Sequence, residues 1–173
     1  MTRSIKVSFL IIFVLILFAL FFAQKISAET CVTLYPPQEK IAASEYYAVS
    51  VNNESSFSYI TKRESRVPND PQTATFTAFS FEGGAVYVEI FVLYDCDIRE
   101  VIIRPLDERI VPLVDGQVIS FTMQEPAYLS VEINGDTTHK CFIFADELEY
   151  DVPDQNANDV WYFGPGVHDI GTT

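Results

Sequence analysis

The fold is decided by the stretch "TFTAFSFEGGAVYVEIFVL", which spans residues 75–93. On both sides of Glu82-Gly83-Gly84 the stretch is rich in Val, Ile, Phe, Tyr and Thr, and its side-chain types change with a period close to two. Successive side chains of a strand point to opposite faces, so this alternation predicts β-strands with one buried face. Glycine tolerates the positive φ of a tight turn. We therefore predict two strands, 75–81 and 85–93, joined as a hairpin.

The same period of two recurs along most of the remaining chain. Turn residues separate these runs, and Asp115-Gly116 and Asn134-Gly135-Asp136 are further hairpin signals. No window has the spacing of a convincing amphipathic helix. These features predict an all-β fold, an antiparallel β-sandwich, over residues 29–149. Besides the two strands above, the expected strands are 46–51, 56–61, 100–105, 118–123, 128–133 and 140–145.

Residues 1–28 have the pattern of an export signal. Arg3 and Lys6 precede an unbroken apolar run, 7–23, and the small pair Ser27-Ala28 follows. A basic start, an apolar middle and a small residue at the cleavage site are typical of a secretory signal peptide. The alternative is an uncleaved membrane anchor, because a spanning helix needs roughly 20 apolar residues. Both alternatives predict export, to the medium, the cell surface or the periplasm, with membrane contact only in the second case.

The charge balance limits the class of partner. The whole chain has a formal net charge of −13, and without residues 1–28 it has 8 basic against 24 acidic residues. Nucleic acids and anionic lipids are bound by clustered Lys and Arg side chains. We therefore expect no nucleic-acid partner. A chain of this length is expected to bury one core and to form one compact domain.

The three cysteines are Cys31, Cys96 and Cys141, an odd number for an oxidising compartment. Cys96 and Cys141 both lie beside apolar strands, which makes them the favoured pair for one disulfide. Two or three buried free thiols are the alternative, because spacing alone does not determine connectivity. The Cys and His spacing matches no zinc motif, and we expect no metal and no cofactor.

The histidines, His139 and His168, have no nucleophile motif around them. No pair of carboxylates stands out among the many acids either. The sequence therefore predicts no catalytic residue.

Aromatic residues are the candidates for ligand contact. An aromatic ring offers an apolar face to a sugar while its polar edge stays hydrated. Tyr47, Tyr59, Trp161 and Tyr162 are the candidate sugar-stacking residues. The competing interpretation is that alternating aromatics form the core or cross-strand pairs, and it is favoured for most of the aromatic residues.

The C-terminal part of the chain has a different pattern. Residues 150–159 are rich in Asp and Asn, contain Pro153 and have no apolar period, which is typical of a linker. The segment "VWYFGPGVHDIGTT", residues 160–173, then resembles the start of a new structural unit. A single repeat cannot bury its apolar face without stacked neighbours. We therefore expect this segment to begin a domain that the chain does not complete.

Four stretches in order carry a family resemblance: "EVIIRP" (100–105), "ISFTMQEPAYLSVEING" (119–135), "CFIFADELE" (141–149) and "DVWYFGPGVHDIG" (159–171). Together they resemble the N-terminal β-sandwich of family 49 glycoside hydrolases, the dextranase and isopullulanase type, and of related polygalacturonase-like proteins. In that family a right-handed parallel β-helix follows the sandwich, and 160–173 resembles its first, here incomplete, coil.

The resemblance implies a function without implying a site. The family's catalytic acids lie on central coils of the β-helix and have no counterpart in this chain. It implies a non-catalytic N-terminal accessory domain of a secreted polysaccharide-degrading glycoside hydrolase, with a missing C-terminal β-helix domain and a polysaccharide as its partners. Dextran, pullulan and pectin stay open as substrates. The alternative is a free-standing secreted or surface-attached carbohydrate-binding module, which predicts aromatics gathered on one exposed face.

Overall fold

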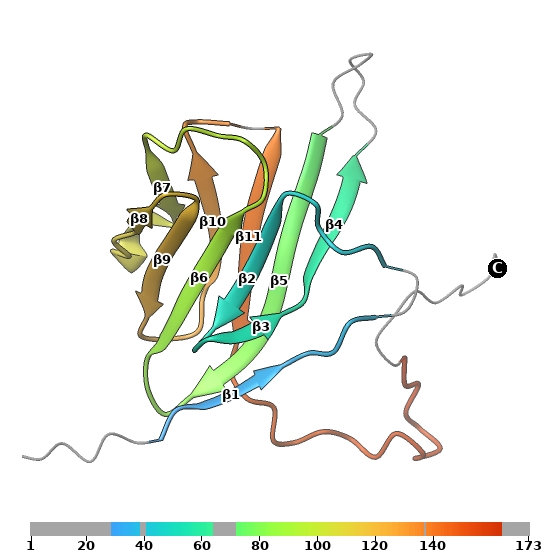
Figure 1. Cartoon of the computed structure of the whole chain (residues 1–173). Coiled ribbons are helices and arrows are strands. Elements are labelled where there is room, and N and C mark those ends of the chain that lie inside the picture. Colours follow the sequence, from blue (N-terminus) through green and yellow to red (C-terminus); the bar gives the residue numbers. More distant parts are fainter. Residues whose placement is uncertain (1–28, 39–40, 64–71, 137, 164–173) are drawn as a thin grey trace, which may run out of the picture.

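The computed structural model describes residues 29–38, 41–63, 72–136 and 138–163. Its strands form two sheets packed face to face (Figure 1), so the all-β class and the sandwich-like arrangement are confirmed. Each of the eight runs expected from the alternation contains a strand, but the run 56–61 is divided at Phe57 between strands of the two sheets. Local alternation is therefore a reliable guide to the strands of this chain, because one face of each strand lies against the other sheet.

The larger sheet, sheet A, has six strands in the described part of the chain. Its order is β1-β5-β11-β10-β7, and β4 also pairs with β5. β5 is the longest strand, and β1 and β4 follow each other along the same edge of it. The strands are β1 (Cys31–Leu34), β4 (Ser58–Arg63), β5 (Gln72–Glu82), β7 (Val101–Arg104), β10 (Tyr128–Ile133) and β11 (His139–Asp146).

The smaller sheet, sheet B, has five described strands in the order β3-β2-β6-β9-β8. Its edge strands β3 and β8 have three residues each, which is too short for a pattern of period two to be recognised. A short 3-10 helix, η1 (Leu106–Glu108), follows β7. The strands are β2 (Tyr47–Val51), β3 (Glu54–Ser56), β6 (Val86–Val92), β8 (Leu113–Asp115) and β9 (Val118–Met123).

Sheet A is mixed, so the prediction of a purely antiparallel sandwich is wrong in one place. β11 pairs with β5 in parallel, from His139 beside Thr73 to Asp146 beside Ser80. All other strand pairs of the described residues are antiparallel. β5 and β11 are distant in the sequence, so no turn between them determines their relative direction.

The predicted hairpin at Glu82-Gly83-Gly84 is also wrong. β5 belongs to sheet A, whereas β6 pairs with β2 and β9 in sheet B, so this turn carries the chain from one sheet to the other. The other two predicted hairpins are confirmed, β8–β9 around Asp115-Gly116 and β10–β11 around Asn134-Gly135-Asp136. A glycine-rich turn between two alternating strands is therefore not enough to decide whether those strands pair.

The core lies between the two sheets and is built from the inward positions of both. Its largest fully buried apolar side chains include Phe79 and Phe81 from β5, Ile90 from β6 and Ile143 from β11. Burying one such side chain contributes about 1.5–3 kcal/mol relative to leaving it exposed. The core therefore holds β5 and β11 against sheet B.

All three cysteines are free in the structure, so the favoured Cys96–Cys141 disulfide is not formed. Cys141 points into the core from β11, and burial raises the pKa of its thiol to about 12. Cys96 lies half-buried after β6, where its Sγ accepts a hydrogen bond from Asn134 Nδ2 at 3.6 Å. Proximity of both cysteines to apolar strands therefore does not pair them.

Several predicted segments lie outside the described residues. They are the signal peptide, 1–28, and most of the segment expected to begin a β-helix, 164–173, which includes His168. Residues 147–163 are described, and they form neither a strand nor a helix. No β-helix is therefore among the described residues. Within the same residues, no helix is long and apolar enough to cross a membrane.

Candidate functional site

The outer face of sheet A carries a band of aromatic rings, which we term the aromatic face. On β5, β10 and β11 these rings alternate with core residues, so they point away from sheet B. The band crosses four neighbouring strands, β4, β5, β11 and β10, which lie side by side in Figure 1. It consists of Tyr59, Phe76, Phe142, Phe144 and Tyr128.

The rings of the aromatic face are in continuous contact. The ring centroids of Tyr59 and Phe76 are 5.1 Å apart with nearly parallel planes, and those of Phe76 and Phe144 are 6.1 Å apart. Phe144 is stacked with Phe142 at 6.0 Å and meets Tyr128 edge to face at 5.6 Å. Pairs of this kind contribute about 0.5–1.5 kcal/mol beyond the burial of their area. The rings therefore hold one another in place as a platform.

Strand register explains why the rings gather here. Phe142 lies beside Phe76 on β5 and beside Ser130 on β10, and the neighbour of Phe144 on β5 is Ala78. Residues opposite one another on a sheet face have Cβ atoms about 4.5–5.5 Å apart. Small side chains at Ser130 and Ala78 leave space above the sheet, so the rings of β11 are only half-buried.

One end of the aromatic face is hollowed. The hollow has a volume of about 620 Å³ and lies between the rings and the turn that follows β7. This size is within the range of roughly 300–1,000 Å³ that is usual for small-molecule sites. Its walls are formed by Arg104, Pro105, Leu106, Asp107, Tyr128, Leu129, Ser130, Phe142 and Phe144.

Polar groups flank the rings. Arg104 Nε lies 2.9 Å from Glu132 Oε1, and the Tyr128 hydroxyl donates to Asp146 Oδ1 at 2.5 Å. The hydrogen bond to this carboxylate raises the pKa of Tyr128 above its ordinary value. A smaller hollow of about 270 Å³, lined in part by Glu132 and Lys140, shares two lining residues with the larger one. The face therefore combines ring surface with hydrogen-bonding groups.

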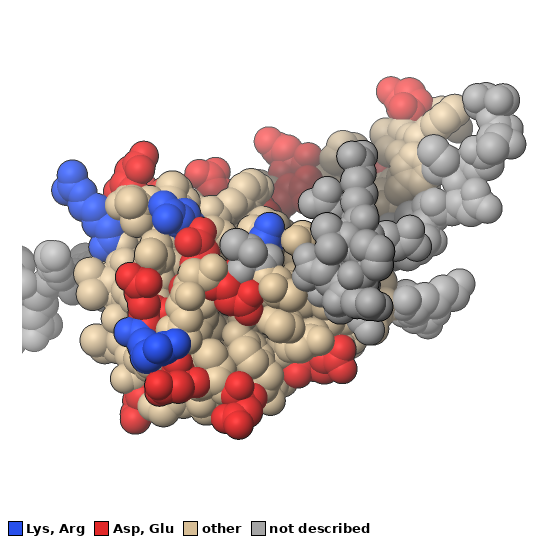
Figure 2. Space-filling model, turned by 90° about the horizontal axis from the view of Figure 1, so that it is seen from above, with Lys and Arg blue, Asp and Glu red and all other residues tan. Residues whose placement is uncertain are grey.

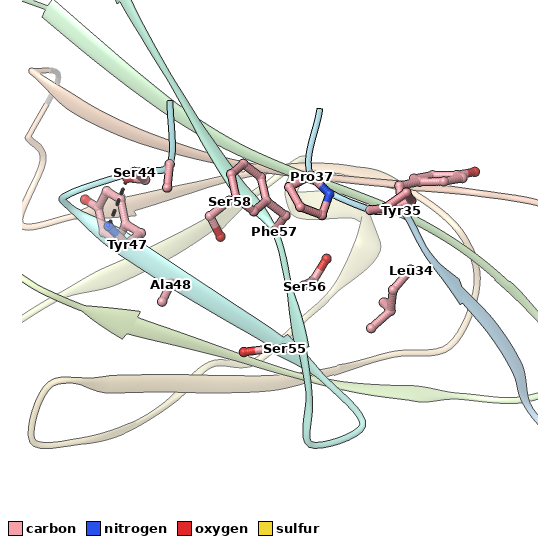
Figure 3. A pocket seen from close by; sticks show the side chains of 12 residues that line it. Leu34, Tyr35, Pro37, Ser44, Tyr47, Ala48, Ser55, Ser56, Phe57 and Ser58 are labelled. Carbon is pink, nitrogen blue, oxygen red and sulfur yellow. Dashed lines mark hydrogen bonds between the residues drawn. The ribbon is translucent and has the colours of Figure 1, made fainter. Parts of the chain in front are cut away.

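A second candidate is the cavity in Figure 3, which we term the crossover pocket. It lies where the chain passes from β3 in sheet B to β4 in sheet A, beside the segment that follows β1. Its volume is about 440 Å³. The lining residues are Leu34, Tyr35, Pro36, Pro37, Ala43, Ser44, Tyr47, Ala48, Ser55, Ser56, Phe57 and Ser58.

The hydroxyl groups of the crossover pocket differ in their partners. Ser44 Oγ lies 2.6 Å from Thr75 Oγ1, and Ser58 Oγ lies 2.8 Å from Thr77 Oγ1. Ser56 Oγ is buried and has no hydrogen-bond partner among the described residues. A buried hydroxyl without a partner is unfavourable by about 1–3 kcal/mol. The Ser56 hydroxyl is therefore buried with hydrogen-bonding capacity that no described residue uses.

Charged side chains are spread over the face of the molecule that Figure 2 shows. Figure 2 looks down on the upper end of the sandwich and shows acidic side chains scattered across it, with a few basic ones between them. The excess of acid agrees with the net charge of −13 for the whole chain. A surface with this excess repels a polyanion and leaves a neutral ligand unaffected.

Two of the predicted sugar-stacking residues, Tyr47 and Tyr59, are buried. Tyr47 is 1% exposed in the core, where its hydroxyl lies 3.0 Å from that of Tyr94 and donates to the His139 carbonyl at 2.9 Å. With so little of its surface accessible, its ring is not free to stack on a sugar. Tyr59 belongs to the aromatic face but is only 6% exposed, and its hydroxyl donates to the Pro36 carbonyl.

The other two, Trp161 and Tyr162, are exposed at 88% and 50%. They lie in the irregular segment after β11, where no strand or helix of the described chain positions them. The structure therefore does not bring the four predicted residues together on one surface.

The sequence offers Tyr128 as one of several tyrosines able to stack on a sugar, but its neighbours Phe76, Phe142 and Phe144 were not predicted as contact residues. A signal for them was present in "KCFIFA", residues 140–145, where both alternate sets of side chains are apolar. A strand that is apolar on both sides usually has both of its faces covered. One face of β11 lies against sheet B, so its second apolar face indicates a contact surface.

The structure also contains an acid–base pair. His139 Nδ1 lies 2.8 Å from Asp136 Oδ2, and the rings of Tyr46 and Tyr94 flank the imidazole. Desolvation opposes ionisation of Asp136, but hydrogen bonds from His139 and Thr138 outweigh it and lower the pKa of this carboxyl. The hydrogen bonds of the His139 ring within the described residues include no serine or cysteine side chain. The pair therefore stabilises the loop between β10 and β11.

Among the described residues, no group of three or more His, Cys, Asp or Glu side chains could hold a metal ion. The candidate sites are thus the aromatic face and the crossover pocket. Comparison with known proteins adds no residue to either of them. No protein-family model matches the chain, and no curated protein sequence matches it.

Proposed function

We propose that this β-sandwich is an exported, non-catalytic carbohydrate-binding domain that serves a polysaccharide-degrading enzyme. The observation that carries the proposal is the aromatic face, on which half-exposed and exposed rings lie beside hydrogen-bonding side chains. Sugar rings offer apolar C–H faces and polar edges, and such a surface is complementary to both. The resemblance of 100–105, 119–135, 141–149 and 159–171 to the sandwich of family 49 glycoside hydrolases supports the same class of ligand.

A neutral polysaccharide is the better ligand on electrostatic grounds. The chain has a net charge of −13, and Asp107, Glu132 and Asp146 lie at or beside the hollow of the aromatic face. Arg104 is already paired with Glu132. Repulsion disfavours a polyuronide such as pectin. We therefore propose an uncharged glucan of the dextran or pullulan kind.

We propose that catalysis is carried out by a separate domain, a parallel β-helix of the enzyme that the sandwich accompanies. The free-standing binding module is the second candidate, and the aromatic face supports it equally. The two differ in whether the catalytic domain belongs to the same polypeptide. Sequencing the transcript beyond the codon of Thr173 separates them, since only the first predicts a following run of short β-rungs.

Affinity electrophoresis in gels that contain dextran, pullulan or polygalacturonate tests the binding itself. We expect the glucans to retard the chain and the polyuronide to leave its migration unchanged. Phe144→Ala should weaken binding by about tenfold, the effect of losing a central aromatic contact. Phe91→Ala is the matched control, because Phe91 is an exposed ring on the outer face of sheet B.

Two results would overturn the proposal. The first is equal retardation of the Phe144→Ala variant and the unchanged chain. The second is migration that none of the three polymers affects.

A further inference from the structure

The crossover pocket exists because two strands on one edge of sheet A stop short of each other. β4 pairs with Gln72–Thr77 of β5, and β1 pairs with Phe79–Glu82. Pro36 and Pro37 follow β1 and have no backbone N–H with which to extend it. The chain enters sheet A at Phe57, between these two strands. The opening in the edge is therefore a consequence of the sequence and of the sheet topology.

The lining of this pocket is polar without being charged. None of its described lining residues is acidic or basic. Hydroxyls come from the serines, and ring surfaces come from Tyr35 and Phe57. Such a lining is complementary to a small neutral molecule that carries several hydroxyls and has an apolar face.

Ser56 marks the place where such a molecule would be held. Its side chain is 7% exposed, and Figure 3 shows its hydroxyl in the space between Phe57, Pro37 and Leu34. A hydroxyl can donate one hydrogen bond and accept two. Buried side-chain hydroxyls normally have a partner, and no described residue is one for Ser56, so this hydroxyl can bond a molecule that enters the pocket.

We infer that the crossover pocket is a second binding site, for a short neutral saccharide of one or two sugar rings. Ser56 hydrogen-bonds a sugar hydroxyl, and Phe57 provides the apolar wall. The pocket volume of about 440 Å³ is within the usual range for small ligands. The inference does not rest on binding at the aromatic face, since the two sites share no lining residue.

Amide chemical-shift mapping of the full chain tests this inference, with isomaltose and maltose as the probes. We expect shifts centred on Ser55, Ser56 and Phe57. Ser56→Ala should weaken binding by about three- to tenfold, the effect of one neutral hydrogen bond. The variant should fold as well as the unchanged chain, because the hydroxyl it removes has no partner within the described residues. Ser120→Ala on β9 is the control, which should leave the affinity unchanged.

Three outcomes would overturn the inference. One is the absence of any shift up to about 50 mM disaccharide, which excludes even weak binding. Another is a set of shifts confined to β10 and β11, which assigns the disaccharide to the aromatic face. The third is unchanged affinity in both Ser56→Ala and Phe57→Leu. Phe144→Ala separates the two proposals, because it should weaken polymer binding and leave disaccharide binding at the pocket unaffected.

Discussion

At the residue scale, Tyr47 and Cys141 both place a polar atom in the core, and the surroundings of these two atoms differ. The Tyr47 hydroxyl is accommodated by hydrogen bonds with Tyr94 and the His139 carbonyl. Cys141 is surrounded by apolar side chains, and its thiol remains neutral because burial disfavours the thiolate. Burial also raises the pKa of Tyr47, as does its hydrogen bond with Tyr94. Both groups therefore hold their protons more tightly in the folded state than in the unfolded state.

Stability should consequently fall in alkaline solution. The pKa of the Cys141 thiol is raised from 9.0 to about 12. The contribution of this thiol to the free energy of unfolding is therefore fully present below pH 9 and is lost as the pH rises from 9 to 12. In that window the unfolded chain releases a proton that the folded chain retains. Urea unfolding at several pH values gives the free energy of unfolding as a function of pH. Between pH 9 and 12 this free energy should fall with pH, and Cys141→Ala should make the fall shallower by about 1.4 kcal/mol per pH unit. Ile143→Val is the control, because it removes no titrating group and should leave the dependence of the unfolding free energy on pH unchanged. The same dependence in the unchanged chain, Cys141→Ala and Ile143→Val would contradict the prediction.

At the scale of elements, β11 shows two roles on opposite sides of one strand. Ile143 points into the core and is fully buried, whereas Phe142 and Phe144 are half-buried on the outer face. Period-two alternation identifies both sets of side chains, but it does not tell which set meets the second sheet. The parallel pairing with β5 supplies Ala78 and Phe76 as outer-face neighbours. The platform is therefore a property of strand register.

Truncations on the two sides of β11 should have unequal effects on stability. Ile143→Ala leaves a cavity in the core and should cost about 2–5 kcal/mol. Phe144→Ala removes ring contacts at the surface and should cost about 0.5–1.5 kcal/mol. Urea denaturation followed by tyrosine fluorescence measures both. A loss for Phe144→Ala as large as that for Ile143→Ala would mean that Phe144 serves the fold and not a ligand.

At the scale of the whole molecule, the two candidate sites lie at different places on one sandwich. The aromatic face covers the outside of sheet A, and the crossover pocket lies where the chain passes between the sheets. The net charge of −13 is compatible with the proposed function, because it does not repel a neutral polymer. Such a function requires export, which the pattern of residues 1–28 predicts.

Export has a direct test. When the full chain is expressed in a secreting host, we expect a protein in the medium whose intact mass is that of residues 29–173, with Glu29 as its first residue. Ala28→Phe places a bulky side chain at the cleavage site and should leave the precursor uncut. A membrane-bound product with the mass of all 173 residues would instead support the anchor.

The sequence by itself determined the all-β class, eight of the eleven described strands and two of the three predicted hairpins. These are local properties, because alternation and turn chemistry involve residues close together in the chain. It did not determine that β5 and β11 run in parallel, or that Glu82-Gly83-Gly84 joins two sheets. Which strands pair, and which of two apolar faces is covered, depends on segments far apart in the sequence. Only the tertiary structure could therefore place Tyr47 in the core and gather Phe76, Phe142, Phe144 and Tyr128 into one surface.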